Sequence, residues 1–258
     1  TFRMPGPWFA ERGITFYAYD QRGFGRAPQP GLWAGGDVLI DDAAEVLASV
    51  RARHPGLPVF AVGVSMGAAV AMSLLENRGS AVADGLVLVS PAVWGWSTLN
   101  PVYRATLWIA AHTFPAATLT GSSLEIWPSD NIEMLRDNFN DPLFIKATRT
   151  DSIFGLVTLM ERGFDSAAGI QVPTLILYGA KDEIIPPRPV ERMISTLKSH
   201  ARLVVYPDGY HMLLRDLQRQ TVWTDMLAWM RSPVGRLPSG HEVPLRTTLG
   251  KPARTVAP

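Results

Sequence analysis

Runs of apolar residues alternate with amphipathic segments through the first third of the chain. Residues 14–19 (ITFYAY), 59–62 and 86–89 (LVLV) are rich in β-branched, aromatic or aliphatic side chains, which predicts buried strands. Residues 37–53 place apolar side chains close to every 3.6 residues, and residues 68–75 are rich in small side chains, so both predict helices. Strands separated by helices favour a parallel sheet that is covered by helices on both faces.

This alternation is interrupted by residues 94–169, which contain no apolar strand pattern. The helix-like pieces within the interruption are residues 101–111, 131–138 and 152–162, and its tryptophans are Trp94, Trp96, Trp108 and Trp127. The alternation then resumes as strand, helix, strand and helix at residues 174–178, 190–198, 202–206 and 213–231. We therefore expect an α/β core of residues 1–93 and 170–233, with a helical cap of residues 94–169 inserted between its strands.

The last part of the chain, residues 234–258, is rich in Pro, Gly, Thr and Arg and has no hydrophobic period. Such a composition predicts a disordered or loosely packed tail. Deleting residues 236–258 should then change the stability of the protein very little.

The composition narrows the classes of function. With 258 residues, of which 47% are hydrophobic and 18% charged, the chain can bury a large core without disulfides. Its formal net charge of +1 gives no electrostatic basis for binding nucleic acid. Cysteine is absent, which excludes thiolate nucleophiles and cysteine-ligated metals. No apolar run is long enough to predict a membrane span, and we expect a cytoplasmic protein. The chain begins with Thr1, so an upstream signal peptide is not excluded.

Residues 63–67 (GVSMG) fit the pattern G-x-S-x-G and stand between a predicted strand and a predicted helix. In that setting the turn lifts the hydroxyl of Ser65 above the edge of the sheet. We expect Gly63 and Gly67 both to be required, because the turn is too tight for side chains. The N–H of Met66, at the start of the helix, can donate to an oxyanion. The alternative is a glycine-rich turn that packs closely for steric reasons alone.

A serine hydroxyl is a weak nucleophile, so the site also needs a base. His211 follows the last predicted strand and is expected at the same edge of the sheet as Ser65. The other four histidines have less suitable positions, in a helix-ending turn, the cap, a helix end and the tail: His54, His112, His200 and His241. The sequence therefore predicts His211 as the general base.

The carboxylate that orients the base should also follow a strand. Asp182 directly follows the predicted strand at residues 174–178 and is the candidate. Glu183 is expected to point the other way if the turn is tight. Asp208 is the other rival, but it lies only three residues before His211 in the same loop. The sequence therefore predicts Asp182 as the orienting group.

Several stretches resemble the α/β-hydrolase fold, and within it the monoacylglycerol lipase and lysophospholipase group of serine hydrolases. They are residues 19–25 (YDQRGFG), 63–67 (GVSMG), 178–182 (YGAKD), 209–213 (GYHML) and, in the cap, 141–143 (DPL). The similarity spans about residues 8–231, and the order of serine, acid and histidine is the order of this fold. It implies a doubly wound, mostly parallel sheet with a helical cap, and it gives Asp20 and Arg22 a structural role in the turn after the first strand.

Members of that group begin with edge strands and a further strand that ends in a His-Gly loop, which supplies the second oxyanion N–H. Residues 1–12 resemble the helix that follows this loop, so only the Met66 donor is assigned in this chain. The same resemblance places a further strand, absent from this sequence, between the segments at 14–19 and 59–62. A missing oxyanion donor lowers the rate by about 10²–10³-fold.

Taken with the residues, the resemblance implies a serine ester hydrolase that acts on lipid-like esters, such as monoacylglycerols or lysophospholipids, through an acyl-enzyme. It implies neither cofactor nor metal. The apolar cap suits an acyl chain or peripheral contact with a membrane, and equally suits packing on the core. A proline aminopeptidase-like enzyme and a C–C hydrolase use the same three residues and stay open. So does a truncated, catalytically impaired hydrolase-like protein or binding module. Enzymes with an aspartate nucleophile are disfavoured by Ser65.

Overall fold

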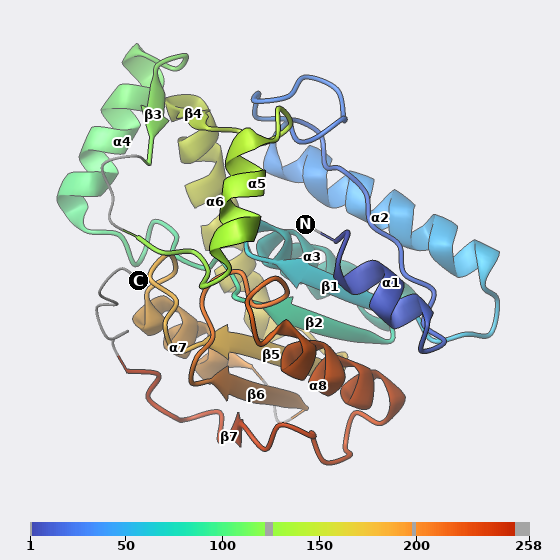
Figure 1. Cartoon of the computed structure of the whole chain (residues 1–258). Coiled ribbons are helices and arrows are strands. Elements are labelled where there is room, and N and C mark those ends of the chain that lie inside the picture. Colours follow the sequence, from blue (N-terminus) through green and yellow to red (C-terminus); the bar gives the residue numbers. More distant parts are fainter. Residues whose placement is uncertain (1, 122–125, 198–199, 251–258) are drawn as a thin grey trace.

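The computed structural model describes residues 2–121, 126–197 and 200–250, and a five-stranded sheet forms its centre (Figure 1). In spatial order its strands are β1 (Phe60–Val64), β2 (Gly85–Val89), β5 (Thr174–Gly179), β6 (Ala201–Tyr206) and β7 (Glu242–Val243). The first four are parallel, and β7 pairs with β6 in the antiparallel direction. The expected α/β class with a mostly parallel sheet is confirmed.

Helices cover both faces of this sheet. On one face lie α1 (Pro5–Ala10) and α8 (Arg219–Arg231), which bury Phe9 and Trp229 against the strands. The other face is covered by α3 (Met66–Arg78) and α7 (Pro187–Thr196), and α2 (Gly36–Arg53) packs on the outer side of α3. Short 3₁₀ turns follow α3 at Gly79–Ala81 and α6 (Thr150–Ser166) at Ala167–Gly169. The strands β2 and β5 are fully buried, as their continuous apolar sequences predict.

Residues 94–169 rise above the carboxyl ends of the strands. They form α4 (Pro101–Thr113), α5 (Ile132–Asn140), α6 (Thr150–Ser166) and a short antiparallel pair, β3 (Thr118–Thr120) with β4 (Ala147–Arg149). The last helix belongs as much to the core as to the cap: at Gly163 a Cβ would lie 2.7 Å from the Cα of Ala69 in α3. Of residues 94–169, with 122–125 outside the described part, α4, α5 and the β3–β4 pair therefore stand away from the sheet.

The prediction of a strand at residues 14–19 is wrong. The segment joins no ladder, and a cavity of about 920 Å³ lies between it and the edge strand β1. A strand needs a neighbour for its backbone groups, and β1 does not reach this segment. The apolar residues that suggested a strand serve another contact, because Phe16 packs on Phe2 and Phe9 with ring centroids 5.7 Å apart in each pair.

Two predicted helices have different limits. The helix predicted for residues 213–231 begins at Arg219, because residues 211–218 form turns that bond to other parts of the chain. The helix predicted for residues 190–198 begins at Pro187 and ends at Thr196, and its last predicted residue, Lys198, lies outside the described residues. Over the described ranges, with gaps at 122–125 and 198–199, none of the helices is long and apolar enough to span a bilayer.

The expectation of an unstructured tail is wrong for residues 234–250. β7 extends the sheet, and Leu237 and Leu249 are buried to 1% and 8% exposure. Arg202 of β6 donates from Nε and Nη2 to Glu242 at 2.8 Å and 2.6 Å. Apolar residues that are spaced irregularly give no period, so the sequence pattern did not reveal this packing. Residues 251–258 lie outside the described part of the chain.

Candidate active site

Ser65 lies on a sharp turn between β1 and α3. Its φ of 51° and ψ of −118° place a non-glycine residue in a rarely adopted backbone conformation. The turn is held by main-chain hydrogen bonds: the Ser65 N–H donates to the Val89 carbonyl at 2.9 Å, and its own carbonyl accepts from Ala68 at 2.9 Å and Ala92 at 3.2 Å. The surrounding structure therefore supports the strained turn, as is usual where a backbone of this kind presents a functional side chain.

Of the two glycines that flank this turn, the structure requires one. A Cβ at Gly63 would lie 2.5 Å from the Cα of Ala68 and from the carbonyl oxygen of Gly67, which is closer than atoms can pack. A Cβ at Gly67 meets nothing within 4 Å. The expectation that both positions exclude side chains is correct for Gly63 and wrong for Gly67, because residue 67 already lies on the first turn of α3 and faces open space.

Ser65, His211 and Asp182 form one hydrogen-bonded row. His211 Nε2 lies 2.9 Å from Ser65 Oγ, and His211 Nδ1 lies 2.8 Å from Asp182 Oδ2. Asp182 is fully buried and His211 is 8% exposed. When Nδ1–H donates to the carboxylate, Nε2 is left as the acceptor for the serine proton. The structure thus brings together the three residues that the sequence singled out.

The carboxylate of Asp182 is held on both oxygens. Its Oδ1 accepts the N–H groups of Ile184 at 2.9 Å and Ile185 at 3.0 Å, which leaves Oδ2 for His211. The hydroxyl of Tyr178 donates to the Ile185 carbonyl at 2.8 Å. Burial, together with the nearby carboxylate, raises the pKa of this hydroxyl above its usual range, so Tyr178 stays a donor and fixes the turn.

The two rival carboxylates have other partners. Asp208 is exposed and accepts from Nζ of Lys181 at 2.8 Å, a hydrogen bond that raises the pKa of the lysine. Glu183 accepts the main-chain N–H of Trp127 at 3.1 Å and so ties the cap to the loop after β5. Of the three carboxylates considered from the sequence, Asp182 is the one that contacts the imidazole.

The remaining histidines contact other parts of the molecule: His54 bonds to the Tyr17 hydroxyl, His112 to the Trp108 carbonyl, His241 packs on Tyr206, and His200 accepts at its carbonyl from Thr174. These four contacts involve neither Ser65 nor Asp182, but His54 also lines the cavity of about 920 Å³ that Ser65 lines. Within residues 2–121, 126–197 and 200–250, no group of three or more His, Asp or Glu side chains could hold a metal ion.

Asp20 and Arg22 fix the loop beside the site. Nε and Nη2 of Arg22 donate to both oxygens of Asp42 in α2, at 2.7 Å and 3.0 Å. Asp20 Oδ2 accepts the main-chain N–H of Arg26 at 2.9 Å. These contacts agree with the structural role that the resemblance implies for both residues.

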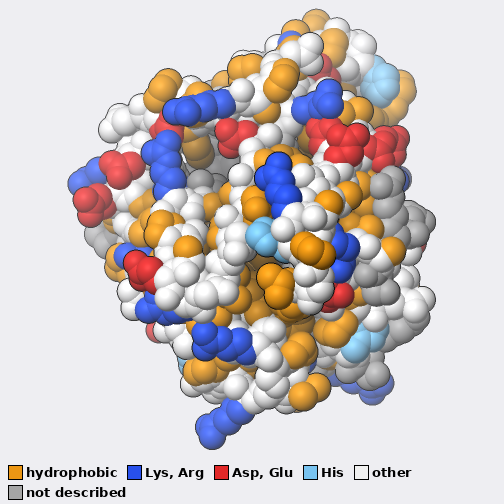
Figure 2. Space-filling view, turned by 90° about the vertical axis from the view of Figure 1, so that its right-hand side faces the viewer, with side chains coloured by type: hydrophobic (Ala, Val, Ile, Leu, Met, Phe, Trp, Pro, Cys, Tyr) orange, Lys and Arg blue, Asp and Glu red, His pale blue; other side chains and the backbone are white. Residues whose placement is uncertain are grey.

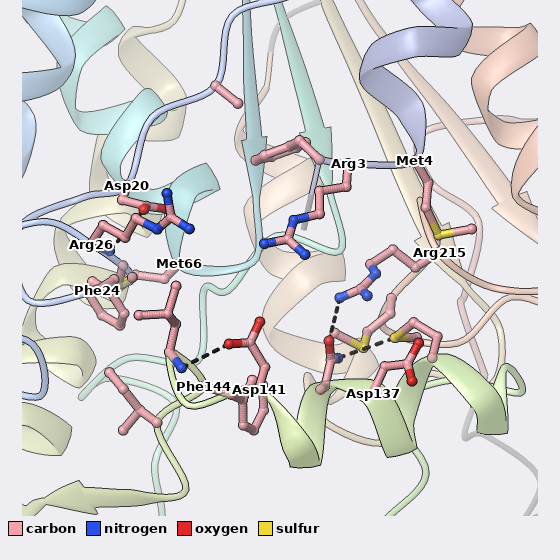
Figure 3. Close-up of a pocket in the computed structure, with 18 of the residues that line it drawn as sticks. Arg3, Met4, Asp20, Phe24, Arg26, Met66, Asp137, Asp141, Phe144 and Arg215 are labelled. Carbon is pink, nitrogen blue, oxygen red and sulfur yellow. Dashed lines mark hydrogen bonds between the residues drawn. The ribbon is translucent and has the colours of Figure 1, made fainter.

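Two cavities meet beside Ser65 and share Met66, Phe24 and Met212 in their walls. The cavity of about 920 Å³ is lined by Ser65, His211 and the apolar side chains around β1. Figure 2 shows this side of the molecule, where hydrophobic side chains surround a hollow. The larger cavity, about 1630 Å³, extends toward α5 (Figure 3). Its charged lining residues are Arg3, Arg26, Arg215, Arg219, Asp20, Glu133, Asp137 and Asp141.

Comparison with known proteins places the chain in a family. Residues 3–218 match the model of the Hydrolase_4 family, described as serine aminopeptidase, S33. The chain belongs to this family of α/β hydrolases. It is 25% identical over 243 residues to a monoacylglycerol lipase from Mycolicibacterium smegmatis, which covers 87% of this chain and 80% of the relative. It is 28% identical over 229 residues to human monoglyceride lipase, which covers 84% of this chain and 73% of the relative.

The fold of this Hydrolase_4 chain also matches solved structures. The crystal structure of a monoacylglycerol lipase from Paleococcus ferrophilus superimposes with a TM-score of 0.76 at 21% identity, over 90% of this chain and 88% of the other. At that identity the likeness shows the α/β-hydrolase fold. The recognition of this fold and of its lipase-like group from the sequence is confirmed.

The cap tryptophans do not line either cavity of this hydrolase. Trp94 and Trp96 pack on the core, and Trp96 also donates from Nε1 to Thr158 at 3.0 Å, while Trp108 is 55% exposed. The apolar side chains that line both cavities beside Ser65 include Phe24, Met66 and Met212, and Phe144 and Leu156 line the larger one. Sequence reasoning also missed Arg215, whose position four residues after His211 points to the site only once residues 211–218 are known to form turns.

Proposed function

We propose that the chain is a serine carboxylic ester hydrolase that acts on lipid-like esters through an acyl-enzyme on Ser65. Ser65 Oγ attacks the ester carbonyl while His211 Nε2 accepts its proton and then donates it to the leaving alcohol. Asp182 holds the imidazole in the tautomer that this requires. The observation that carries the proposal is the row of hydrogen bonds from Ser65 to His211 to Asp182, beside a cavity.

The N–H of Met66 is the proposed oxyanion donor. It is at the first position of α3, where main-chain N–H groups have no partner within the helix. The positive end of the helix dipole lies at the same place and favours the developing negative charge. Deacylation repeats these steps with water as the nucleophile, because the same imidazole can remove a proton from water and return it to Ser65.

A glycerol ester with a medium or long acyl chain is the proposed substrate. The two relatives whose names include monoacylglycerol or monoglyceride lipase support it. So does the apolar cavity next to Ser65, whose 920 Å³ can take a long aliphatic chain. Each buried CH₂ contributes about 0.8 kcal/mol, so kcat/KM should rise several-fold for every two added carbons until the cavity is filled.

A fluorophosphonate probe tests the nucleophile. The wild-type protein should be labelled and should hydrolyse p-nitrophenyl esters, whereas Ser65→Ala should do neither and keep the wild-type circular dichroism. Ser195→Ala, at an exposed position of α7, is the matched control and should behave as wild type. Labelling that persists in Ser65→Ala would place the nucleophile elsewhere. A chain-length series of monoacylglycerols tests the substrate, and a maximum at two or four carbons would contradict a lipase.

Peptide hydrolysis is the second candidate. The family name favours it, and so do Glu133, Asp137 and Asp141, which line the larger cavity and could pair with the ammonium group of a peptide. The arginines in the same cavity oppose such pairing. A prolyl amide substrate tested beside the ester series decides between the two, because faster cleavage of the amide would favour an aminopeptidase.

We further propose that the cap rests on a lipid surface. The outer side of α4 and the segment after it expose a group of large apolar side chains: Val102, Tyr103, Trp108, Ile109, Phe114 and Leu119. Exposed apolar groups of this size mark interaction sites. The double variant Trp108→Ser/Ile109→Ser should lose sedimentation with phosphatidylcholine vesicles while it hydrolyses a soluble ester normally. Val234→Ser, at a residue that is 94% exposed, is the control.

A further inference from the structure

The loop that carries the base is fastened to the cap. This loop, residues 207–218, connects β6 to α8, and it meets residues 127–131, where the cap chain approaches the core. The bonds between them are Met212 N–H to the Pro128 carbonyl (2.9 Å), Asn131 Nδ2 to the Arg215 carbonyl (2.9 Å), Leu217 N–H to Asp130 Oδ1 (2.9 Å) and Ser129 Oγ to Asp216 Oδ1 (2.6 Å). Asp216 is the one charged side chain of the loop in this set.

Asp216 is fully buried and uses both carboxylate oxygens. Oδ1 accepts from the Ser129 hydroxyl, and Oδ2 accepts the main-chain N–H of Tyr210 at 2.8 Å. Tyr210 and Met212 are the two neighbours of His211 in the chain. The N–H on one side of the base is therefore held by Asp216, and the N–H on the other side is held by the cap segment to which Asp216 is joined.

We propose that Asp216 is a positioning residue, which sets the distance between His211 and Ser65 and couples it to the seating of the cap through Ser129. The proposal rests on the proposed function, because it concerns the base of that same site. Asp216 does not touch the imidazole, and its effect passes through the main chain at Tyr210. Since proton transfer is sensitive to displacements of about 1 Å, a small movement of this loop should lower turnover strongly.

The environment of Asp216 makes its charge responsive to pH. Burial raises the pKa of the Asp216 carboxyl to about 6, and its two hydrogen bonds oppose that rise. Among charged neighbours, Asp130 of the cap segment raises the pKa further and His211 lowers it. Arg219 donates to the main-chain carbonyl of Asp216 at 3.1 Å. As the pH falls through about 6, Asp216 gains a proton and loses one of its two acceptor sites.

Kinetics of Asp216→Asn test the proposal. The amide keeps one acceptor oxygen but replaces the other with a donor, so the two bonds to Tyr210 and Ser129 cannot both form as they do in wild type. We expect kcat for a p-nitrophenyl ester to fall by about 10–100-fold, with KM changed by less than about threefold. Asp225→Asn is the matched control, because Asp225 is also fully buried and also accepts two hydrogen bonds, from Tyr206 and Ser239, but lies in α8.

The pH profile separates positioning from general weakening of the fold. In wild type, kcat/KM should decrease as the pH falls through about 6, because Asp216 gains a proton there and loses one of its two acceptor sites. Asp216→Asn should lack this part of the acid limb, because the amide does not titrate in this range. Ser129→Ala removes the hydrogen bond from the cap to Asp216 and leaves Asp216 ionisable, so it should lower kcat by about 3–10-fold. If Asp216→Asn does not fold, this variant tests the positioning role in its place.

The outcomes are distinct. The positioning role would be overturned if Asp216→Asn and Asp225→Asn had equal turnover, or if Ser129→Ala had wild-type turnover. It would also be overturned if wild type and Asp216→Asn had the same acid limb in their pH profiles. Wild-type protein that reacts with neither fluorophosphonate nor ester would overturn the proposed function itself, and the inference with it. A labelled wild type with unaffected Asp216 and Ser129 variants would overturn the inference alone.

Discussion

Removing residues 236–258 should destabilise the protein considerably, although the sequence suggests that the tail is dispensable. The deletion removes two buried side chains, Leu237 and Leu249. Burying each leucine contributes about 2 kcal/mol to the free energy of unfolding. It also leaves the guanidinium of Arg202, whose side chain is 16% exposed, without Glu242, which costs about 1–3 kcal/mol. Together these losses amount to about 5–7 kcal/mol. Because the remaining chain can relax, we expect the free energy of unfolding to fall by at least about 3 kcal/mol.

Thermal unfolding followed by circular dichroism measures this effect. One kcal/mol corresponds to about 2–4 °C in a protein of this size, so the midpoint should fall by about 10 °C. A chain that ends at Gly250 keeps every described contact and is the control. The point variant Leu237→Ala should cost about 2–4 kcal/mol, against less than 0.5 kcal/mol for Val234→Ala, which is 94% exposed. A shift below 2 °C on deletion would refute the packing of the tail.

Three further predictions concern the site. Asp182→Asn should lower kcat by about 10⁴-fold and Asp208→Asn by less than twofold, because Asp182 contacts the imidazole whereas Asp208 is exposed and pairs with Lys181. Steady-state kinetics measure both, and a larger loss in Asp208→Asn would contradict the assignment. Gly63→Ala should abolish activity or folding, whereas Gly67→Ala should stay active, since only the first added methyl meets the helix backbone. Folding raises the pKa of Asp216 from 3.8 to about 6, so the native state binds the proton more tightly than the unfolded state, and the free energy of unfolding of wild type should fall by about 2 kcal/mol relative to Asp216→Asn as the pH rises from 4 to 7. Urea titrations at both pH values measure the difference, and an equal gap at both would contradict the buried charge.

The parts of the fold that the sequence predicts well are those with a strong local signal. β2 and β5 are continuous apolar runs, and the turn at Ser65 combines a motif with a strand and a helix on either side. Residues 14–19 have the same local signal, but a strand exists only where another strand pairs with it. Phe16 packs on Phe9 of α1 instead, and Tyr17 packs on His54, contacts that no pattern within the segment reveals.

The site was predictable to a similar extent. Ser65, Asp182 and His211 each follow a strand, so their meeting at one edge of the sheet follows from topology. The contacts that hold them were not predictable, because they join residues far apart in the chain. Asp216 bonds to a serine 87 positions away, and Glu183 to a main-chain group 56 positions away. Such pairs leave no period and no motif in the sequence.

The seating of α6 directly against α3 has a consequence for exchanging caps between relatives. Grafting residues 94–169 as a block would replace α6, whose Gly163 touches the helix that starts at Met66, and would disturb the turn at Ser65. Junctions drawn further out, near residues 97 and 149, would exchange α4, α5 and the β3–β4 pair while α6 stays in place. In such chimaeras Ser129 and Asn131 would have to be retained. They lie within the exchanged segment, but they bond to Asp216 and to the Arg215 carbonyl in the part of the chain that stays.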